Sequence, residues 1–188
     1  MTVAAAVLAL FVGAALQSAT GFGFALVSAP ILFALLGPQQ AVTAGVLVAL
    51  VLNGLTLATE RRRPQVLVRD ALALLGWSLP GIALGALALR ELPDRLLSAL
   101  VGFAVLAGVA LRALSHRRGA PARLRPWHLP ASGATGGALS TSTSLSGPPL
   151  VFYLLARRAS PTQTRDTLAA IFFAQAVLGV PALVLSGT

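Results

Sequence analysis

The stretch 17-QSATGFGFALVSAPILFALLGPQQ-40 is mostly apolar and carries no charge, yet helix-breaking and hydrogen-bonding residues recur along it. Glycine and proline are the two poorest helix formers, and both occur here between apolar runs. The apolar segments on either side of the glycines, residues 3–16 and 24–36, would each be roughly 20 Å long as helices. Neither would comfortably span a bilayer core of ~30 Å on its own. We therefore expect a helical hairpin over residues 3–36 whose tip, residues 17–23, lies inside the membrane.

The composition of the whole chain places it in a membrane. Hydrophobic residues make up 56% of the 188 residues, charged residues only 10%, and the mean hydropathy is +0.85. Because a soluble domain carries about 25% charged residues, the sequence predicts an all-α polytopic membrane protein. Cysteine is absent, which excludes disulfides. No paired titratable residues lie within the apolar runs, so we expect neither an enzyme nor a bound metal or cofactor.

Further apolar runs follow the first hairpin. Four of them are long enough to span a bilayer at ~1.5 Å per residue, the shortest with help from flanking arginines. Two shorter runs surround the hydroxyl-rich stretch 140-STSTSLSG-147 and predict a second hairpin with its tip inside the membrane. The predicted spans are residues 41–59, 71–89, 96–111 and 167–185, and the second hairpin covers residues 129–156.

The two predicted hairpins resemble each other in sequence. The segment 29-APILFALLG-37 aligns with 148-PPLVFYLLA-156, and 38-PQQ-40 aligns with 161-PTQ-163 once four extra residues are allowed. An ordered match of prolines, an aromatic residue and a glutamine indicates an internal duplication. We divide the chain accordingly into a first repeat over residues 1–114, a basic loop over 115–126 and a second, truncated repeat over 127–188.

The arginines predict how the chain crosses the membrane. The net charge of +9 comes from arginine, since the chain has no lysine, and most of the 14 basic residues lie in three segments between apolar runs. Short basic loops of this kind mark the cytoplasmic side of a membrane protein rather than a nucleic-acid partner. The N-terminus is then outside, and three spans separate the two hairpins, which therefore enter from opposite sides. The basic segments, with four, five and three arginines, are residues 60–70, 112–126 and 157–165.

This topology makes the two repeats inverted relative to each other. Inverted repeats with broken helices at mid-membrane are typical of secondary transporters, which bind substrate at the repeat interface. The second repeat ends after one span, so we expect either a truncated copy or a chain that is completed by self-association.

Polar residues at the two predicted tips favour a small anion as the ligand. Hydroxyl groups and the unbonded N–H groups at a helix start can replace the hydration shell of an oxyanion without a buried cation. The same hydroxyls could instead cap helix ends or bond carbonyls of their own helix, and buried amides could join neighbouring helices. The predicted substrate-binding residues are Thr20, Gly21, Gly23, Ser142, Thr143, Ser144 and Ser146, with Gln17, Asn53, Pro30, Pro149 and Gln175 as secondary candidates.

The motifs 20-TGFGFALVSAP-30 and 147-GPPLVFYLL-155 resemble the TauE/SafE family of sulfite and organosulfonate exporters, over essentially the whole chain apart from the family's last two spans. The resemblance implies export of a small sulfur-containing oxyanion across the bacterial inner membrane by alternating access, coupled to a proton or sodium gradient. The sequence departs from the family's denser glycine run, because Phe22 and Phe24 interrupt the first motif and serine and threonine replace glycine in the second. A passive anion channel and a non-transporting truncated scaffold remain the alternatives.

Overall fold

The computed structural model describes the backbone of residues 2–20, 23–59, 63–118 and 125–186, and within them the side chains of residues 7–17, 23–59, 63–110 and 125–185. Every regular element in this part of the chain is a helix. The helices are α1 (Thr2–Thr20), α2 (Phe24–Leu36), α3 (Pro38–Thr59), α4 (Val68–Glu91), α5 (Asp94–Arg118), α6 (His128–Thr143), α7 (Gly147–Ala156) and α8 (Pro161–Ser186).

Helix breaks lie in both stretches where the sequence predicts hairpin tips, between α1 and α2 and between α6 and α7. Three described helices are long and apolar enough to cross a membrane, and they contain three of the four predicted spans. The fourth predicted span lies within α5, which has 25 residues. The three helices with spanning character are Pro38–Thr59, Val68–Glu91 and Pro161–Leu185.

Three helix ends differ from the sequence expectation. Helix α1 has 19 residues and continues to Thr20, and α6 continues to Thr143, because serine, threonine and glutamine each cost a helix well under ~1 kcal/mol. Helix α5 runs to Arg118 and takes in the first part of the predicted basic loop, since leucine, alanine and arginine are good helix formers.

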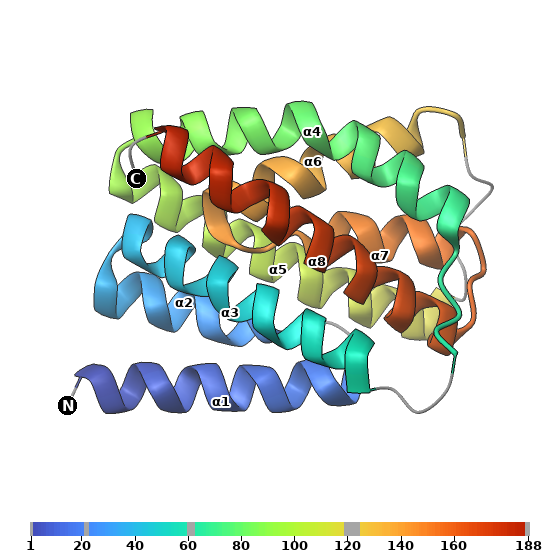
Figure 1. The fold of residues 1–188 in the computed structure, drawn as a ribbon, viewed down its shortest axis with the longest axis horizontal. Coiled ribbons are helices and arrows are strands. Elements are labelled where there is room, and N and C mark those ends of the chain that lie inside the picture. Colours follow the sequence, from blue (N-terminus) through green and yellow to red (C-terminus); the bar gives the residue numbers. More distant parts are fainter. Residues whose placement is uncertain (1, 21–22, 60–62, 119–124, 187–188) are drawn as a thin grey trace.

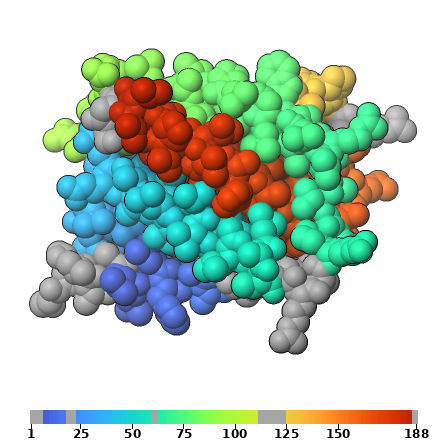
Figure 2. Space-filling model, in the orientation of Figure 1, coloured from blue at the N-terminus to red at the C-terminus, as the bar shows by residue number. Residues whose placement is uncertain are grey.

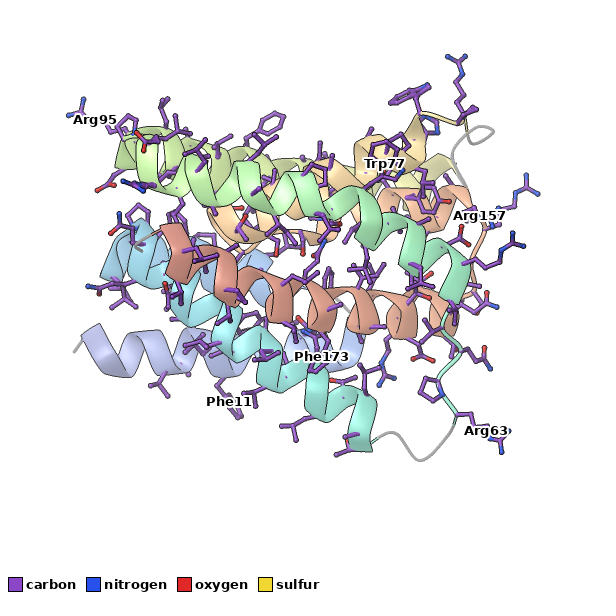
Figure 3. The ribbon with its side chains drawn as sticks, turned by 45° about the horizontal axis from the view of Figure 1, so that its top comes forward. Phe11, Arg63, Trp77, Arg95, Arg157 and Phe173 are labelled. Carbon is purple, nitrogen blue, oxygen red and sulfur yellow. The ribbon has the colours of Figure 1, made fainter. Side chains whose placement is uncertain are left out.

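The two hairpins enter the molecule from opposite ends and meet near its middle (Figure 1). Both chain termini lie at one end, and the α1–α2 hairpin enters from there. The α6–α7 hairpin enters from the other end, where the connections from α3 to α4 and from α7 to α8 also lie. Arg63 and Arg157 project from that second end, whereas Arg95 projects from the end with the termini (Figure 3). We call the second end the arginine-rich end.

Glycines allow α4 and α6 to pack with their backbones in near contact. A Cβ atom added at Gly81 or Gly85 of α4 would overlap the carbonyl group of Ala134 or Ala138 of α6. Such close approach of small residues is how helices associate in membranes, and 81-GIALG-85 has the spacing for it. Helix α8 then crosses the face that α3 and α4 form (Figure 2).

The described side chains bury two apolar clusters. The first includes Leu32, Val42 and Leu145, and the second includes Leu74 and Leu150. Large apolar side chains also cover the outer surface, where Phe11 is 72% exposed. An exterior of this kind suits contact with lipid rather than with water.

Candidate functional site

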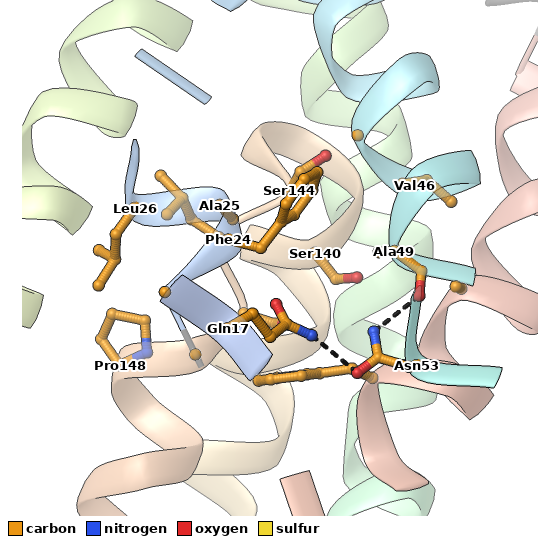
Figure 4. Close-up of a pocket in the computed structure, with 17 residues that line it drawn as sticks. Gln17, Phe24, Ala25, Leu26, Val46, Ala49, Asn53, Ser140, Ser144 and Pro148 are labelled. Carbon is orange, nitrogen blue, oxygen red and sulfur yellow. Dashed lines mark hydrogen bonds between the residues drawn. The ribbon is translucent and has the colours of Figure 1, made fainter. Parts of the chain in front are cut away.

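A small cavity lies where the two hairpin tips meet. Its volume is about 50 Å³. Side chains from both hairpins and from α3 and α8 surround it, and none of them is charged (Figure 4). Its polar lining consists of two amides, three hydroxyls and the backbone at two helix starts. The lining residues are Gln17, Gly23, Phe24, Ala25, Leu26, Gly45, Val46, Ala49, Asn53, Ser140, Ser144, Leu145, Ser146, Gly147, Pro148, Phe172 and Ala176.

The two amides of the cavity bond to each other. The Nε2 of Gln17 donates to the Oδ1 of Asn53 at 2.9 Å, and the Nδ2 of Asn53 donates to the carbonyl oxygen of Ala49 at 2.7 Å (Figure 4). Asn53 is 1% exposed. The pair joins α1 to α3 at the cavity wall, so both amides have a structural role while they line the site.

The three hydroxyls come from the end of α6 and the start of α7. Ser144 ends α6 with a left-handed backbone, φ 59°, and its N–H bonds the carbonyl of Ser140. The N–H of Leu145 bonds the carbonyl of Leu139, as in the glycine-terminated turns that close many helices. The hydroxyl of Ser144 donates to the carbonyl oxygen of Val42 on α3 at 3.2 Å. The hydroxyls of Ser140 and Ser146 have no hydrogen-bond partner among the described residues.

Two helices begin at this cavity. Gly23 precedes α2 with φ 127°, a backbone conformation that favours glycine. The next three residues line the cavity, and among the described residues the first N–H of α2 that bonds a carbonyl is that of Val27, which bonds Gly23 at 3.3 Å. Helix α7 begins at Gly147 with prolines in its first turn, which have no N–H to leave unbonded. The positive ends of both helix dipoles therefore meet at one place.

Other predicted residues lie elsewhere. The hydroxyls of Ser142 and Thr143 donate to carbonyls of their own helix at 2.7 and 2.8 Å, and neither residue lines the cavity. Gln175 donates to the hydroxyl of Ser78 at 3.0 Å, between α8 and α4. Pro30 lines a separate apolar groove between α2 and α5, and Pro149 lies beside the cavity without lining it. Gly21 and the side chain of Thr20 lie outside the described residues.

The structure adds cavity residues that the sequence does not single out. Ser140 lies one helical turn before Ser144 and shares its face of α6, a spacing that is visible in the sequence. No spacing or motif in the sequence points to Gly45 of α3. A Cβ atom added there would come within 2.8 Å of the Ser144 hydroxyl oxygen, so its lack of a side chain makes room for that hydroxyl.

A second polar cluster lies at the arginine-rich end and ties helices together. The Asp70 carboxylate accepts a hydrogen bond from the Tyr153 hydroxyl at 2.9 Å and two from the Arg157 guanidinium at 3.0 and 3.2 Å. This partner raises the pKa of Arg157 above its ordinary value, first through the hydrogen bond and then through opposite charge. Asp166 accepts the N–H of Gln65 at 2.7 Å, so the chain before α4 is also bound to α8.

An all-helical membrane protein with two broken-helix hairpins that meet at an uncharged cavity lined by amides and hydroxyls has the architecture of a membrane transporter. A family model described as Sulfite exporter TauE/SafE matches residues 5–188. The chain belongs to this family, which is one of transporters rather than enzymes. The resemblance in the two hairpin motifs is thereby confirmed. No curated protein and no solved structure matches the chain.

Proposed function

We propose that the chain exports a small sulfur-containing oxyanion across the bacterial inner membrane by alternating access, and that it binds this anion between the two hairpin tips. The observation that carries the proposal is the cavity itself. It brings two amides, three hydroxyls and two helix starts together. The amides, the hydroxyls of Ser140 and Ser146 and the N–H groups at the start of α2 are able to donate hydrogen bonds to an oxyanion. We assign substrate contact to Gln17, Gly23, Asn53, Ser140, Ser144 and Ser146.

The size of the cavity favours sulfite over organosulfonates with longer carbon chains. One water molecule needs about 10–15 Å³ of cavity volume, and this cavity has about 50 Å³. The space therefore suits a few waters or one anion of about four heavy atoms, by the same comparison. Sulfite has that size.

The transport cycle that we propose moves one hairpin-containing repeat against the other. The entry of the two hairpins from opposite ends supports this movement, because each tip can then expose the cavity to a different side (Figure 1). The arginine-rich end is assigned to the cytoplasm and the N-terminus to the outside. A proton or a sodium ion drives the cycle.

The first test is transport of labelled sulfite into proteoliposomes that contain the purified chain, with and without a proton or sodium gradient. Gradient-driven flux is the expected result. Flux that ignores both gradients would instead identify a passive anion channel. Absence of flux with sulfite and with sulfonates, despite correct insertion, would contradict the proposal and leave a non-transporting scaffold.

The hydroxyl assignment has a matched pair of variants. In S140A/S144A/S146A the cavity loses all three hydroxyls, and we expect sulfite flux per folded protein to fall at least about tenfold, because hydrogen bonds to charged groups are the strong ones. The control S142A/T143A removes two hydroxyls that bond their own helix outside the cavity. Equal losses in the two variants would contradict the assignment.

A further inference from the structure

The proposed anion site contains no compensating charged side chain. None of the residues that line the cavity is titratable. Residues 1–59, which supply α1, α2 and α3, include no titratable side chain at all. An anion in this cavity is therefore balanced by dipoles alone.

The titratable side chains of the surrounding helices lie toward their ends. On α8 the nearest are Arg165 and Asp166, and Asp166 is six residues, or ~9 Å along the helix, from the cavity residue Phe172. Tyr153 of α7 bonds Asp70 of α4 at the arginine-rich end. The others on the packed helices are at the ends of α4, α5 and α6, at residues 69–70, 90–91, 94–95, 112–118 and 128.

The helix ends at the cavity supply little net positive charge. A helix N-terminus acts like about half a positive elementary charge and a C-terminus like about half a negative one. Because α1 and α6 end beside the cavity where α2 and α7 begin, these contributions largely cancel, and hydrogen bonds must balance a bound anion. The cost of taking an ion out of water grows with the square of its charge, so a dianion would pay roughly four times the desolvation of a monoanion. Hydrogen bonds from amides and hydroxyls do not grow in that proportion.

We propose that the cavity selects singly charged oxyanions and excludes dianions of the same size. This inference rests on the proposed function and names the ionic form of its substrate, which for sulfite is the protonated hydrogensulfite ion. The serine hydroxyls suit that form, because a hydroxyl can accept the proton of the bound ion as well as donate to its oxygens.

The direct test compares two near-isosteric anions by calorimetric titration of the intact chain in detergent. Methanesulfonate and sulfate have the same number of heavy atoms and a similar tetrahedral shape, but methanesulfonate carries one charge and sulfate two. We expect methanesulfonate to bind at least about tenfold more tightly than sulfate. Equal affinities, or tighter binding of sulfate, would overturn the inference whether or not the chain transports anything.

The second test follows flux into proteoliposomes as the pH is raised across the second ionisation of sulfite, with flux into protein-free vesicles subtracted. Raising the pH from one unit below that pKa to one unit above it lowers the hydrogensulfite fraction about tenfold. Sulfite flux is expected to fall by the same factor, while methanesulfonate flux, whose charge does not change, stays constant. Sulfite flux that stays constant or rises would overturn the inference but leave the proposed transport intact.

The methanesulfonate control shows whether a pH dependence of flux comes from the charge of the transported ion or from the protein. If methanesulfonate flux falls in parallel with sulfite flux, the pH dependence belongs to the protein and the inference is overturned. If methanesulfonate binds more tightly than sulfate in the calorimeter but no anion crosses the membrane, the charge selectivity holds and the proposed transport function fails.

Discussion

Ser144 combines a structural and a chemical role at one position, and two variants separate them. A left-handed backbone costs a non-glycine residue about 1–2 kcal/mol, so S144G keeps the turn and removes the hydroxyl, whereas S144A removes the hydroxyl and keeps the backbone cost. We expect S144A to be less stable than S144G by about 1 kcal/mol, and both to lose sulfite flux to the same extent. Thermal unfolding in detergent and flux per folded protein measure the two effects. Full sulfite flux in S144G would show that the Ser144 hydroxyl does not contact the substrate.

At the same scale, the sequence predicts which tips carry the site but not which of their side chains face it. Gly23, Ser144 and Ser146 were predicted and line the cavity. Ser142 and Thr143 were predicted and do not, because α6 continues through them and turns their side chains onto its own carbonyls. The serine- and threonine-rich pattern of residues 140–147 does not by itself indicate that α6 continues to Thr143, so it does not give the helical register. With that register known, the i, i+4 spacing of Ser140 and Ser144 follows at once.

The contact between α4 and α6 makes a sharp prediction about single glycines. G85A would place a methyl group against the Ala138 carbonyl and the Thr141 hydroxyl, so we expect a loss of about 1–3 kcal/mol in the free energy of unfolding. G76A on the same helix is the control, because a Cβ atom there has no neighbour within 4 Å. Thermal unfolding of both variants in detergent checks the difference. A G85A variant as stable as G76A would show that the helices are not packed this closely.

Hydropathy predicts the helices that must cross the lipid bilayer. The helix propensity of individual residues sets where those helices end. The predicted spans lie within α3, α4, α5 and α8, because a bilayer demands long apolar helices. Helix ends were less predictable. Polar residues at the end of α1 and arginines at the end of α5 do not stop a helix, so both run beyond their apolar cores.

At the scale of the whole molecule, side-chain bonds join helices more strongly at the arginine-rich end than at the end with the termini. A variant that removes an ion pair tests this difference. D70N removes the charge that binds Arg157 and weakens the bond from Tyr153, so we expect a loss of about 1–2 kcal/mol after allowance for the half-exposed arginine. The control is E91Q at the other end, where Glu91 pairs with its exposed neighbour Arg90 at 3.5 Å and should matter by less than ~0.5 kcal/mol. Equal effects on thermal unfolding would contradict the difference.

Which helices pack against each other could be read from the sequence only where backbones approach closely. The spacing of Gly81 and Gly85 predicts that α4 packs closely against another helix, and that helix is α6. Apolar side chains elsewhere carry no such signal, since a leucine packs equally well on lipid and on another helix. The crossing of α8 over α3 and α4 was therefore not predictable from the sequence.

The polar cluster at the arginine-rich end has a consequence for the timing of the proposed cycle. Separating the helices there means breaking the bonds that join Asp70 to Tyr153 and Arg157, and those that join Asp166 to Gln65 and Thr167 to Leu67. At the opposite end, the one ion pair that the described residues form lies within α4 and opposes no such separation. The conformation with these bonds intact should therefore have the longer dwell time, and the step that breaks them should limit turnover.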